Sequence, residues 1–248
     1  MKPYFRVFGS ALFFAGLQFA AGQGIILVQH SGFNNPTNEG FTLAGIGSQA
    51  NVGPVTGGGV NAWNTTVSNV NNNINYVYSL TPLQQSETVG VDWILSGSLQ
   101  VLESGGGPNA FIGANSFGMY IGSETNGDPF VDGTRSNPVF LLSGGGGGYH
   151  NYQLVYTAAT GDVALWVDSV ERVPDLFNET ATGISQIRFG EGQGGPASDN
   201  WNLVSISLGV PEPSSAALII LGCGVLIYVR TRGKKRSAPA NSVRQFEQ

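Results

Sequence analysis

Short stretches in which apolar and polar residues alternate make up much of this chain, and glycine- and asparagine-containing turns separate them. In one of them Val89, Val91, Trp93 and Leu95 occupy alternate positions, which is typical of a strand with one buried face. Between residues 23 and 209, helix-forming residues never sustain a period of about 3.6 residues. The pattern therefore predicts an all-β region of short strands and turns.

The expected strands are spread along the whole of this region. Ser96-Gly97 is a tight-turn signal between two of them, so a hairpin is expected there. The clearest hairpin is expected where two alternating stretches flank a turn at residues 158–162. The expected strands are residues 25–28, 41–43, 75–80, 89–95, 98–103, 117–121, 139–142, 152–156, 163–167, 184–189 and 204–208.

The second hairpin resembles a stretch that is common in concanavalin A-like, laminin-G-type jelly rolls. The residues that carry this resemblance are His150, Tyr152, Leu154, Tyr156, Thr160, Gly161, Val163, Leu165, Val167 and Asp168. The family usually has glycine after that aspartate, where this chain has Ser169. The resemblance implies that residues 23–209 form a two-sheet antiparallel jelly-roll sandwich.

The N-terminal residues 1–22 have the features of a secretory signal peptide. Lys2 and Arg6 precede a largely apolar stretch at residues 7–21, and small residues at 20–22 favour cleavage before Gln23. The alternative is an uncleaved membrane anchor. Either arrangement would export residues 23–209, which are enough for one domain with a single sizeable core.

A second apolar segment lies near the other end. Residues 216–229 contain no charged side chain, and five cations follow within residues 230–236. As a helix, residues 216–229 would span roughly 21 Å, short of a hydrocarbon core of roughly 30 Å, and flanking arginines can make up the difference. The pattern predicts a single transmembrane helix over residues 214–229 with the basic end in the cytoplasm; the alternative is a buried core helix.

Pro211, Glu212 and Pro213 stand directly before this apolar segment. The order of Pro-Glu-Pro, apolar span and basic residues over 210–236 closely resembles the PEP-CTERM sorting signal of exported bacterial proteins. The resemblance implies recognition by an exosortase, a membrane protease-transpeptidase that processes such signals near the Pro-Glu-Pro. It also implies a role in an extracellular polysaccharide or biofilm matrix. Residues 237–248 would be a cytoplasmic tail.

Charge is divided sharply between regions. Residues 23–209 contain fourteen acidic and three basic side chains, a formal charge of −11, and no lysine. Such a domain repels nucleic acid, so no nucleic-acid partner is expected. The only cysteine, Cys223, lies in the apolar segment, so the exported region has no disulfide and depends on its core for stability.

The sequence shows no constellation that is typical of catalysis. His30 and His150 are the only histidines, and there is no G-x-S-x-G nucleophile elbow. Jelly rolls include glycan-cleaving enzymes that use paired carboxylates, but no expected strand here carries alternating acidic residues. We therefore expect a protein that is not an enzyme. A glycan-cleaving enzyme remains an alternative, with Glu87, Asp92 and Glu103 as the residues to test.

Two kinds of binding site are expected. Asp128 and Asp132 share one loop region with asparagines, and hard cations prefer such oxygen ligands, so Ca²⁺ is the one cofactor considered. A sugar-binding site combines an aromatic surface with amide hydrogen bonds. The candidate residues for it are Trp63 with Asn64, and Trp201 with Asn200; the alternative is that both indoles belong to the core.

Three hypotheses follow from the sequence. The first is an exported surface or matrix protein with a non-catalytic, lectin-like β-sandwich, held at the membrane by its C-terminal helix until it is processed. The second is a carbohydrate-binding module of the lectin type. The third is a glycan-cleaving jelly-roll enzyme.

Overall fold

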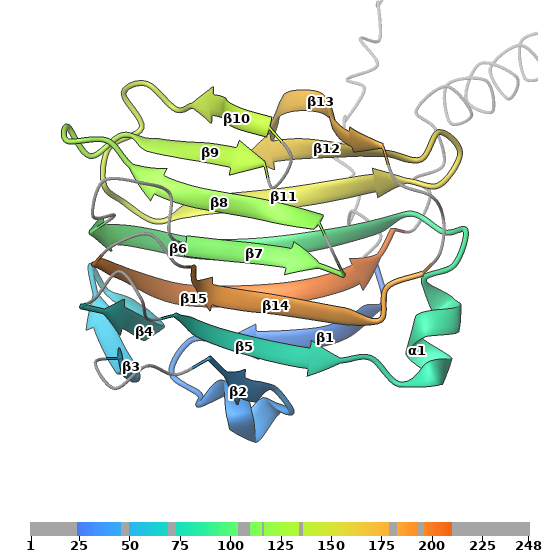
Figure 1. Cartoon of the computed structure of the whole chain (residues 1–248), viewed down its shortest axis with the longest axis horizontal. Coiled ribbons are helices and arrows are strands. Elements are labelled where there is room, and N and C mark those ends of the chain that lie inside the picture. The colour runs from blue at the N-terminus through green and yellow to red at the C-terminus, as the bar shows by residue number, and fades with distance from the viewer. Residues whose placement is uncertain are drawn as a thin grey trace, which may run out of the picture. The chain divides into compact units, whose positions relative to one another are not determined.

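Two antiparallel β-sheets, stacked face to face, make up the part of the chain that the structure, a computed structural model, describes (Figure 1). The described residues are 24–45, 50–68, 73–103, 110–115, 117–133, 136–178, 183–192 and 196–209. They belong to one compact unit, Gly24–Pro211. The expected signal peptide, the Pro-Glu-Pro motif, the apolar span 214–229 and the cytoplasmic tail lie outside the described residues.

The first sheet has eight strands, and the long last strand of the described region pairs with the first strand. In spatial order it contains β13 (Val170–Asn178), β12 (Asp162–Val167), β11 (His150–Thr157), β6 (Trp93–Glu103), β15 (Ala197–Leu208), β4 (Val60–Val67) and β3 (Ala50–Gly57). The first half of β15 pairs with β4, and its second half pairs with β1 (Ile26–Ser31).

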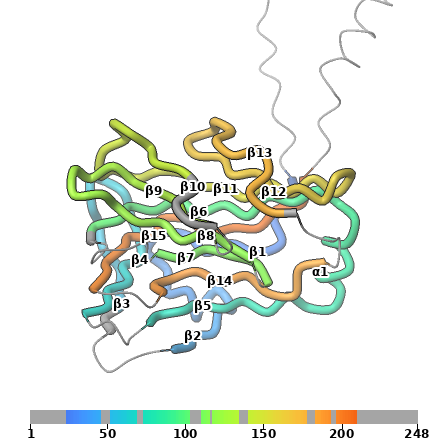
Figure 2. Tube along the Cα trace, turned by 45° about the horizontal axis from the view of Figure 1, so that its top comes forward, coloured from blue at the N-terminus to red at the C-terminus, as the bar shows by residue number. Residues whose placement is uncertain are grey.

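The second sheet has seven strands and is the nearer layer in Figure 1. In spatial order it contains β10 (Ser136–Leu141), β9 (Pro129–Gly133), β8 (Phe117–Ser123), β7 (Ala110–Ala114), β14 (Gln186–Glu191), β5 (Ile74–Ser79) and β2 (Thr42–Ala44). Strands far apart in sequence, such as β14 and β5, lie side by side in both views (Figure 2).

The core lies between the sheets, because alternate side chains of each strand point inward. Leu95, Leu154 and Trp201 from the first sheet are fully buried, as are Ile112 and Ile187 from the second. Two antiparallel sheets with this crossed strand order form a jelly-roll β-sandwich, which confirms the fold class expected from the sequence.

The hairpin expected at residues 149–168 is confirmed as β11 and β12, with Tyr156 opposite Val163 in register. The next turn, between β12 and β13, consists of Asp168 and Ser169, whose φ angles are 51° and 65°. Two-residue hairpin turns favour positive φ at both positions, which is why glycine is common there. Ser169 therefore adopts a left-handed conformation that glycine would adopt with less strain.

The hairpin expected at Ser96-Gly97 is wrong. β6 continues through these residues, and Gly97 faces the core, where a Cβ atom would lie 2.8 Å from Ile112 Cδ1 and 3.7 Å from Trp201 Cζ3. The glycine makes room for packing between the sheets and does not form a turn. The strand expected from residue 89 also begins later, at Trp93, because Val89 and Gly90 belong to a turn.

A short helix, α1 (Pro82–Glu87), was not expected from the sequence. Thr81 caps it: the Thr81 hydroxyl accepts a hydrogen bond from the Gln84 backbone N–H, and the Gln84 side chain accepts one from the Thr81 backbone N–H. The helix lies at one end of the sandwich in Figure 1. No helix within the described ranges is long and apolar enough to cross a membrane.

Candidate functional site

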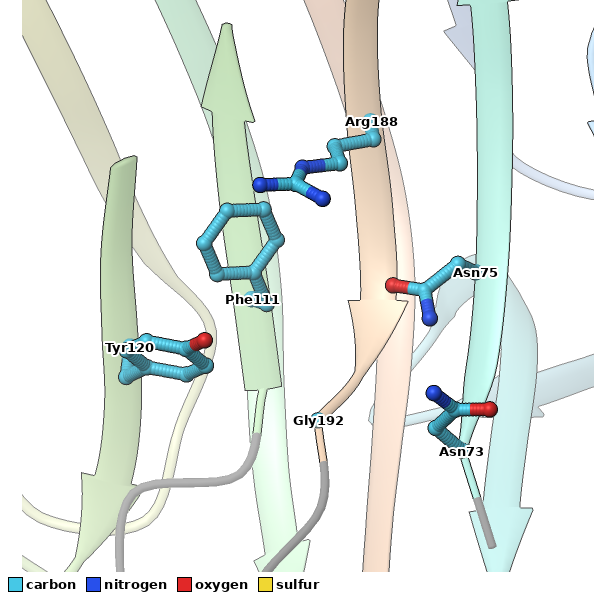
Figure 3. A pocket seen from close by; sticks show the side chains of 6 residues that line it. All are labelled: Asn73, Asn75, Phe111, Tyr120, Arg188 and Gly192. Carbon is cyan, nitrogen blue, oxygen red and sulfur yellow. The ribbon is translucent and has the colours of Figure 1, made fainter. Parts of the chain in front are cut away.

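A row of residues crosses the outer face of the seven-stranded sheet. Tyr120 on β8 lies opposite Phe111 on β7, Phe111 lies opposite Gly190 on β14, and Gly190 lies opposite Asn75 on β5. Around this row the surface has a hollow of about 370 Å³. The residues that line it are Asn73, Asn75, Phe111, Tyr120, Arg188 and Gly192 (Figure 3). We refer to this hollow as the outer-face pocket.

Phe111 forms the base of one side of the pocket. A Cβ atom on Gly113 would lie 2.6 Å from Phe111 Cζ, and one on Gly118 would lie 2.7 Å from the same atom. The ring therefore needs both glycines beneath it. Tyr120 packs on it with 4.9 Å between ring centroids, and the Arg188 guanidinium lies 4.7 Å from the Phe111 centroid. This base leaves Phe111 only 3% exposed and presents Tyr120 and Arg188 at the surface.

Two amides face these groups across β14. Figure 3 shows Asn73 and Asn75 on the β5 side, the aromatic rings and Arg188 on the other side, and Gly192 between them. Within the described part of the chain, neither asparagine side chain hydrogen-bonds to another residue. Arg188 Nε is likewise buried without a hydrogen-bond partner. The pocket thus offers aromatic surface, a cation and free amide groups, the combination that recognises hydroxyl-rich ligands.

The structure brings the predicted sugar-binding residues together, since Trp201 pairs with Trp63 and Asn200 with Asn64. The two indoles, however, lie in the core. Trp63 Nε1 donates to the Tyr76 hydroxyl at 2.9 Å, and Trp201 is fully buried. Neither ring presents a face on which a sugar can stack in this structure.

The two asparagines lie on the outer face of the eight-stranded sheet and bond to each other. Asn64 Nδ2 donates to Asn200 Oδ1 at 2.9 Å, and the Thr66 hydroxyl donates to Asn64 Oδ1 at 2.8 Å. Thr66 Oγ1 also lies 2.9 Å from Ser198 Oγ. We refer to Asn64, Thr66, Ser198 and Asn200 as the polar row. Ligand binding by Asn64 and Asn200 stays a prediction.

The two predicted calcium ligands have different surroundings. The Asp128 carboxylate accepts backbone hydrogen bonds from Gly144 at 2.8 Å and Gly146 at 3.1 Å, and one from the Asn126 amide. These bonds lower the pKa of Asp128, the Gly144 bond most of all, and they order the glycine-rich loop. Asp132 lies opposite Tyr120 on the outer face, where burial raises its pKa. The described residues contain no cluster of three acidic, histidine or cysteine side chains that could hold a metal ion.

A pair of buried acids was not expected from the sequence. Glu191 and Asp199 are both fully buried between the sheets. The Thr65 hydroxyl donates to Glu191 Oε1 at 2.9 Å, and Trp201 Nε1 donates to Thr65 Oγ1 at 3.1 Å. Burial raises the pKa of Asp199 well above its usual range, and the neighbouring Glu191 raises it further. Burial also raises the pKa of Glu191, so burial disfavours the charged form of both acids.

Both histidines bond to carboxylates. His30 Nδ1 bonds to Glu39, its ring stacks on Phe189, and burial lowers its pKa. His150 Nδ1 lies 2.8 Å from Asp168 Oδ2 and joins the start of β11 to the end of β12. These contacts fix loops and strand ends around the core.

The outer-face pocket was not expected from the sequence. Strand β7 was not expected, and the sequence distinguishes Arg188 only as one of three cations in residues 23–209. The signal that could have found it is an outward-facing aromatic residue between outward-facing glycines: Tyr120 alternates with Gly118 and Gly122 along β8. Such small neighbours leave a hollow around a large ring.

No family model matches the chain, and no curated protein matches it. Solved structures do resemble it. A carbohydrate esterase from the Shiga toxin-encoding bacteriophage phi24B is 8% identical with a TM-score of 0.57, over 75% of this chain and 100% of the esterase chain. The globular domain of T. cruzi calreticulin is 10% identical with a TM-score of 0.50, over 75% of this chain and 90% of its own.

Botulinum neurotoxin type C, whose cell entry depends on interaction with two ganglioside molecules, is 8% identical with a TM-score of 0.50. The match covers 80% of this chain and 51% of the neurotoxin chain, so the present chain spans about half of that structure. At these identities the likeness concerns the fold alone. The chain therefore shares its jelly-roll sandwich fold with these proteins.

Proposed function

We propose that the sandwich is a non-catalytic carbohydrate-binding domain and that the outer-face pocket is its binding site. The observation that carries the proposal is the set of free polar groups beside an aromatic wall: Asn73, Asn75 and Arg188 lack polar partners among the described residues, next to Tyr120. Sugars present an apolar face for an aromatic ring and hydroxyls for amides. The same ligand class is supported by two proteins that share this fold, a carbohydrate esterase and a neurotoxin whose cell entry depends on interaction with gangliosides.

We further propose that this domain is exported and retained at the membrane or cell surface. The support is the sequence pattern at both ends: a signal-like segment at residues 1–22, and Pro-Glu-Pro, apolar span and cations over 210–236. Processing by an exosortase-type enzyme near Glu212 would release the domain into an extracellular polysaccharide or biofilm matrix. The intact mass of the mature protein from its native host tests this, because it gives both termini. An unprocessed chain from Met1 to Gln248 would contradict both cleavages.

A glycan array probed with the full chain, kept in mild detergent, tests the binding function. We expect binding to a subset of glycans, loss of that binding in Tyr120→Ala, and no hydrolysis of the bound glycan. A matched control is Tyr78→Ala, which replaces a tyrosine that packs against Phe41 on the inner side of the same sheet. Binding that survives Tyr120→Ala, or cleavage of the glycan, would contradict the proposal.

A further inference from the structure

The Arg188 side chain carries a charge that no described residue neutralises. Its guanidinium lies over Phe111, its Nε is buried without a hydrogen-bond partner, and it forms no ion pair in the described part of the chain. Residues 23–209 contain only three cations against fourteen acidic residues. Acidic residues far outnumber cations in this domain, so most arginines would find a carboxylate partner. The absence of such a partner for Arg188 among the described residues therefore needs an explanation.

Among the residues that the structure describes, those around Arg188 are neutral. The pocket residues around it are two asparagines, two aromatic residues and a glycine. The stretches that adjoin them in sequence, residues 69–72, 104–109 and 193–195, contain no acidic residue. Glu191 is close in sequence but faces the core, where it bonds to Thr65. Asp132 is on the same face but three strands away, which corresponds to about 14 Å at the usual strand spacing.

A second arginine, Arg172, also stacks on an aromatic ring, and its Nε is likewise buried without a hydrogen-bond partner, but it has an acidic residue nearby. Arg172 lies over the Phe140 ring with 5.4 Å from its guanidinium carbon to the ring centroid, much as Arg188 lies over Phe111. Burial acts to raise the pKa of Asp168, but hydrogen bonds from the Asn151 backbone and His150 lower it, and the positive charge of Arg172 adds to the lowering. Arg172 therefore has an acidic neighbour. Arg188 has the same stacking without the acid.

A guanidinium presents a planar fork of N–H donors that matches a carboxylate and binds it with two parallel hydrogen bonds. We propose that the outer-face pocket selects sugars that carry a carboxylate, such as the uronic-acid units of an acidic polysaccharide. Arg188 pairs with the carboxylate, Tyr120 contacts the sugar ring, and Asn73 and Asn75 bond to its hydroxyls. This inference rests on the proposed carbohydrate-binding function and adds the charge of the ligand.

The net charge of the domain opposes an anionic ligand at long range, but the pocket acts at short range. At about 0.1 M salt, interactions between exposed charges are largely screened beyond about 10 Å. The neutral lining around Arg188 lets its positive charge dominate within that distance. Short uronate oligosaccharides, which extend little beyond the pocket, are therefore the appropriate probe.

The test compares an oligogalacturonate with its fully methyl-esterified form, which is the same sugar without the negative charge. Binding of each to the full chain in mild detergent is measured by titration calorimetry for the wild type, Arg188→Gln, Arg188→Lys and Arg172→Gln. We expect the acid form to bind at least about ten-fold more tightly than the ester, as a charge-assisted bidentate contact allows. Arg188→Gln removes this difference, Arg188→Lys retains part of it, and Arg172→Gln leaves it unchanged.

The outcomes separate this inference from the function on which it rests. If acid and ester bind equally well and Tyr120→Ala abolishes both, the proposed carbohydrate site is supported and the preference for a carboxylate is overturned. Tight binding of a sulfated oligosaccharide with none of the uronate would overturn it as well. Failure of every glycan on the array would overturn both proposals. Even if Arg188→Gln fails to fold, the comparison of acid and ester binding to the wild type still tests the preference for a carboxylate.

Discussion

The two outer faces of the sandwich carry similar residue types, but they differ in whether the polar side chains hydrogen-bond to other residues. In the polar row on the eight-stranded sheet, Asn64 and Asn200 bond to each other and to neighbouring hydroxyl and backbone groups. In the outer-face pocket on the seven-stranded sheet, Asn73, Asn75 and Arg188 find no such partners within the described residues. Polar groups that satisfy one another stabilise a sheet surface, whereas unsatisfied groups around a hollow are available to a ligand.

The aromatic residues differ in the same way. Trp63 and Trp201, beside the polar row in sequence, point into the core and hydrogen-bond there. Tyr120 points outward and rests on Phe111. An aromatic residue and an amide in adjacent positions of a strand therefore face opposite sides of the sheet and do not line the same surface.

Exchange of the aromatic residues for alanine should give the largest contrast. Trp201→Ala should lower the free energy of unfolding by about 3–5 kcal/mol, since it empties a fully buried site. Tyr120→Ala should lower it by less than about 1 kcal/mol and abolish glycan binding. Urea unfolding and a binding assay measure both effects. Trp201→Phe keeps a ring in the core, so a folded Trp201→Phe protein that no longer binds glycan would break the comparison.

The glycines beneath Phe111 give the next largest effect. A Cβ atom at position 118 would lie 2.6 Å from the Ile112 carbonyl oxygen and 2.7 Å from Phe111 Cζ. Gly118→Ala should cost about 1–3 kcal/mol of stability and weaken glycan binding, because the ring must move. Gly53→Ala is the control, since no atom lies within 4 Å of its Cβ position. Equal behaviour of the two variants would show that Phe111 does not depend on Gly118.

The asparagines of the two faces should separate stability from binding. Asn200→Ala removes a partner of Asn64 from the polar row and should cost about 1 kcal/mol of stability without affecting glycan binding. Asn75→Ala should change stability by less than about 0.5 kcal/mol and weaken glycan binding several-fold. Thermal unfolding and titration calorimetry measure the two effects. The reverse result would place the ligand at the polar row.

The buried acids between the two sheets, Glu191 and Asp199, should give the smallest effect, which is a dependence of stability on pH. Because the pKa of Asp199 is raised in the folded state, its contribution to stability is complete at pH values below its unfolded pKa. That contribution is lost as the pH rises through the folded pKa, where a buried charge must form. Asp199→Asn should therefore raise the melting temperature near neutral pH by a few degrees relative to the wild type, and change it less near pH 4.

Asp175→Asn, at an exposed carboxylate, is the control for this change of net charge. Asp128 and Asp168 have lowered pKa values, so their stabilisation is lost in the opposite direction, as the pH falls. The difference between wild type and Asp199→Asn isolates the buried pair. A constant difference across this pH range would contradict the raised pKa.

Alternation was enough to predict an all-β region and the hairpin at β11 and β12, because one buried face imposes a period of two. The jelly-roll arrangement was implied by the resemblance of that hairpin to concanavalin A-like domains. Alternation could not place the turns reliably. Gly97 looked like a turn residue, but it is there because Ile112 and Trp201 fill the space that a side chain would need. That reason depends on the opposite sheet and leaves no local signal in the sequence.

The outer-face pocket could not be predicted from the sequence for a similar reason. Its residues lie in, or directly beside, four strands, β8, β7, β14 and β5, whose spatial order does not follow the sequence. The spacing along the chain therefore does not predict that Tyr120 and Asn75 share a row. The buried acids are a comparable case: Glu191 follows inward-facing Ile187 and Phe189 at the correct period, but its partners Thr65 and Asp199 are brought to it only by the fold.

The most direct test of the contrast between the two faces is an NMR titration of the full chain in mild detergent with oligogalacturonate and its methyl ester. The side-chain amide signals of Asn73 and Asn75 report on the pocket, and those of Asn64 and Asn200 report on the polar row. We predict that the acid form shifts the signals of Asn73, Asn75 and the Gly192 backbone amide, with the polar row unchanged. Shifts confined to Asn64 and Asn200 would contradict a binding site on the seven-stranded sheet.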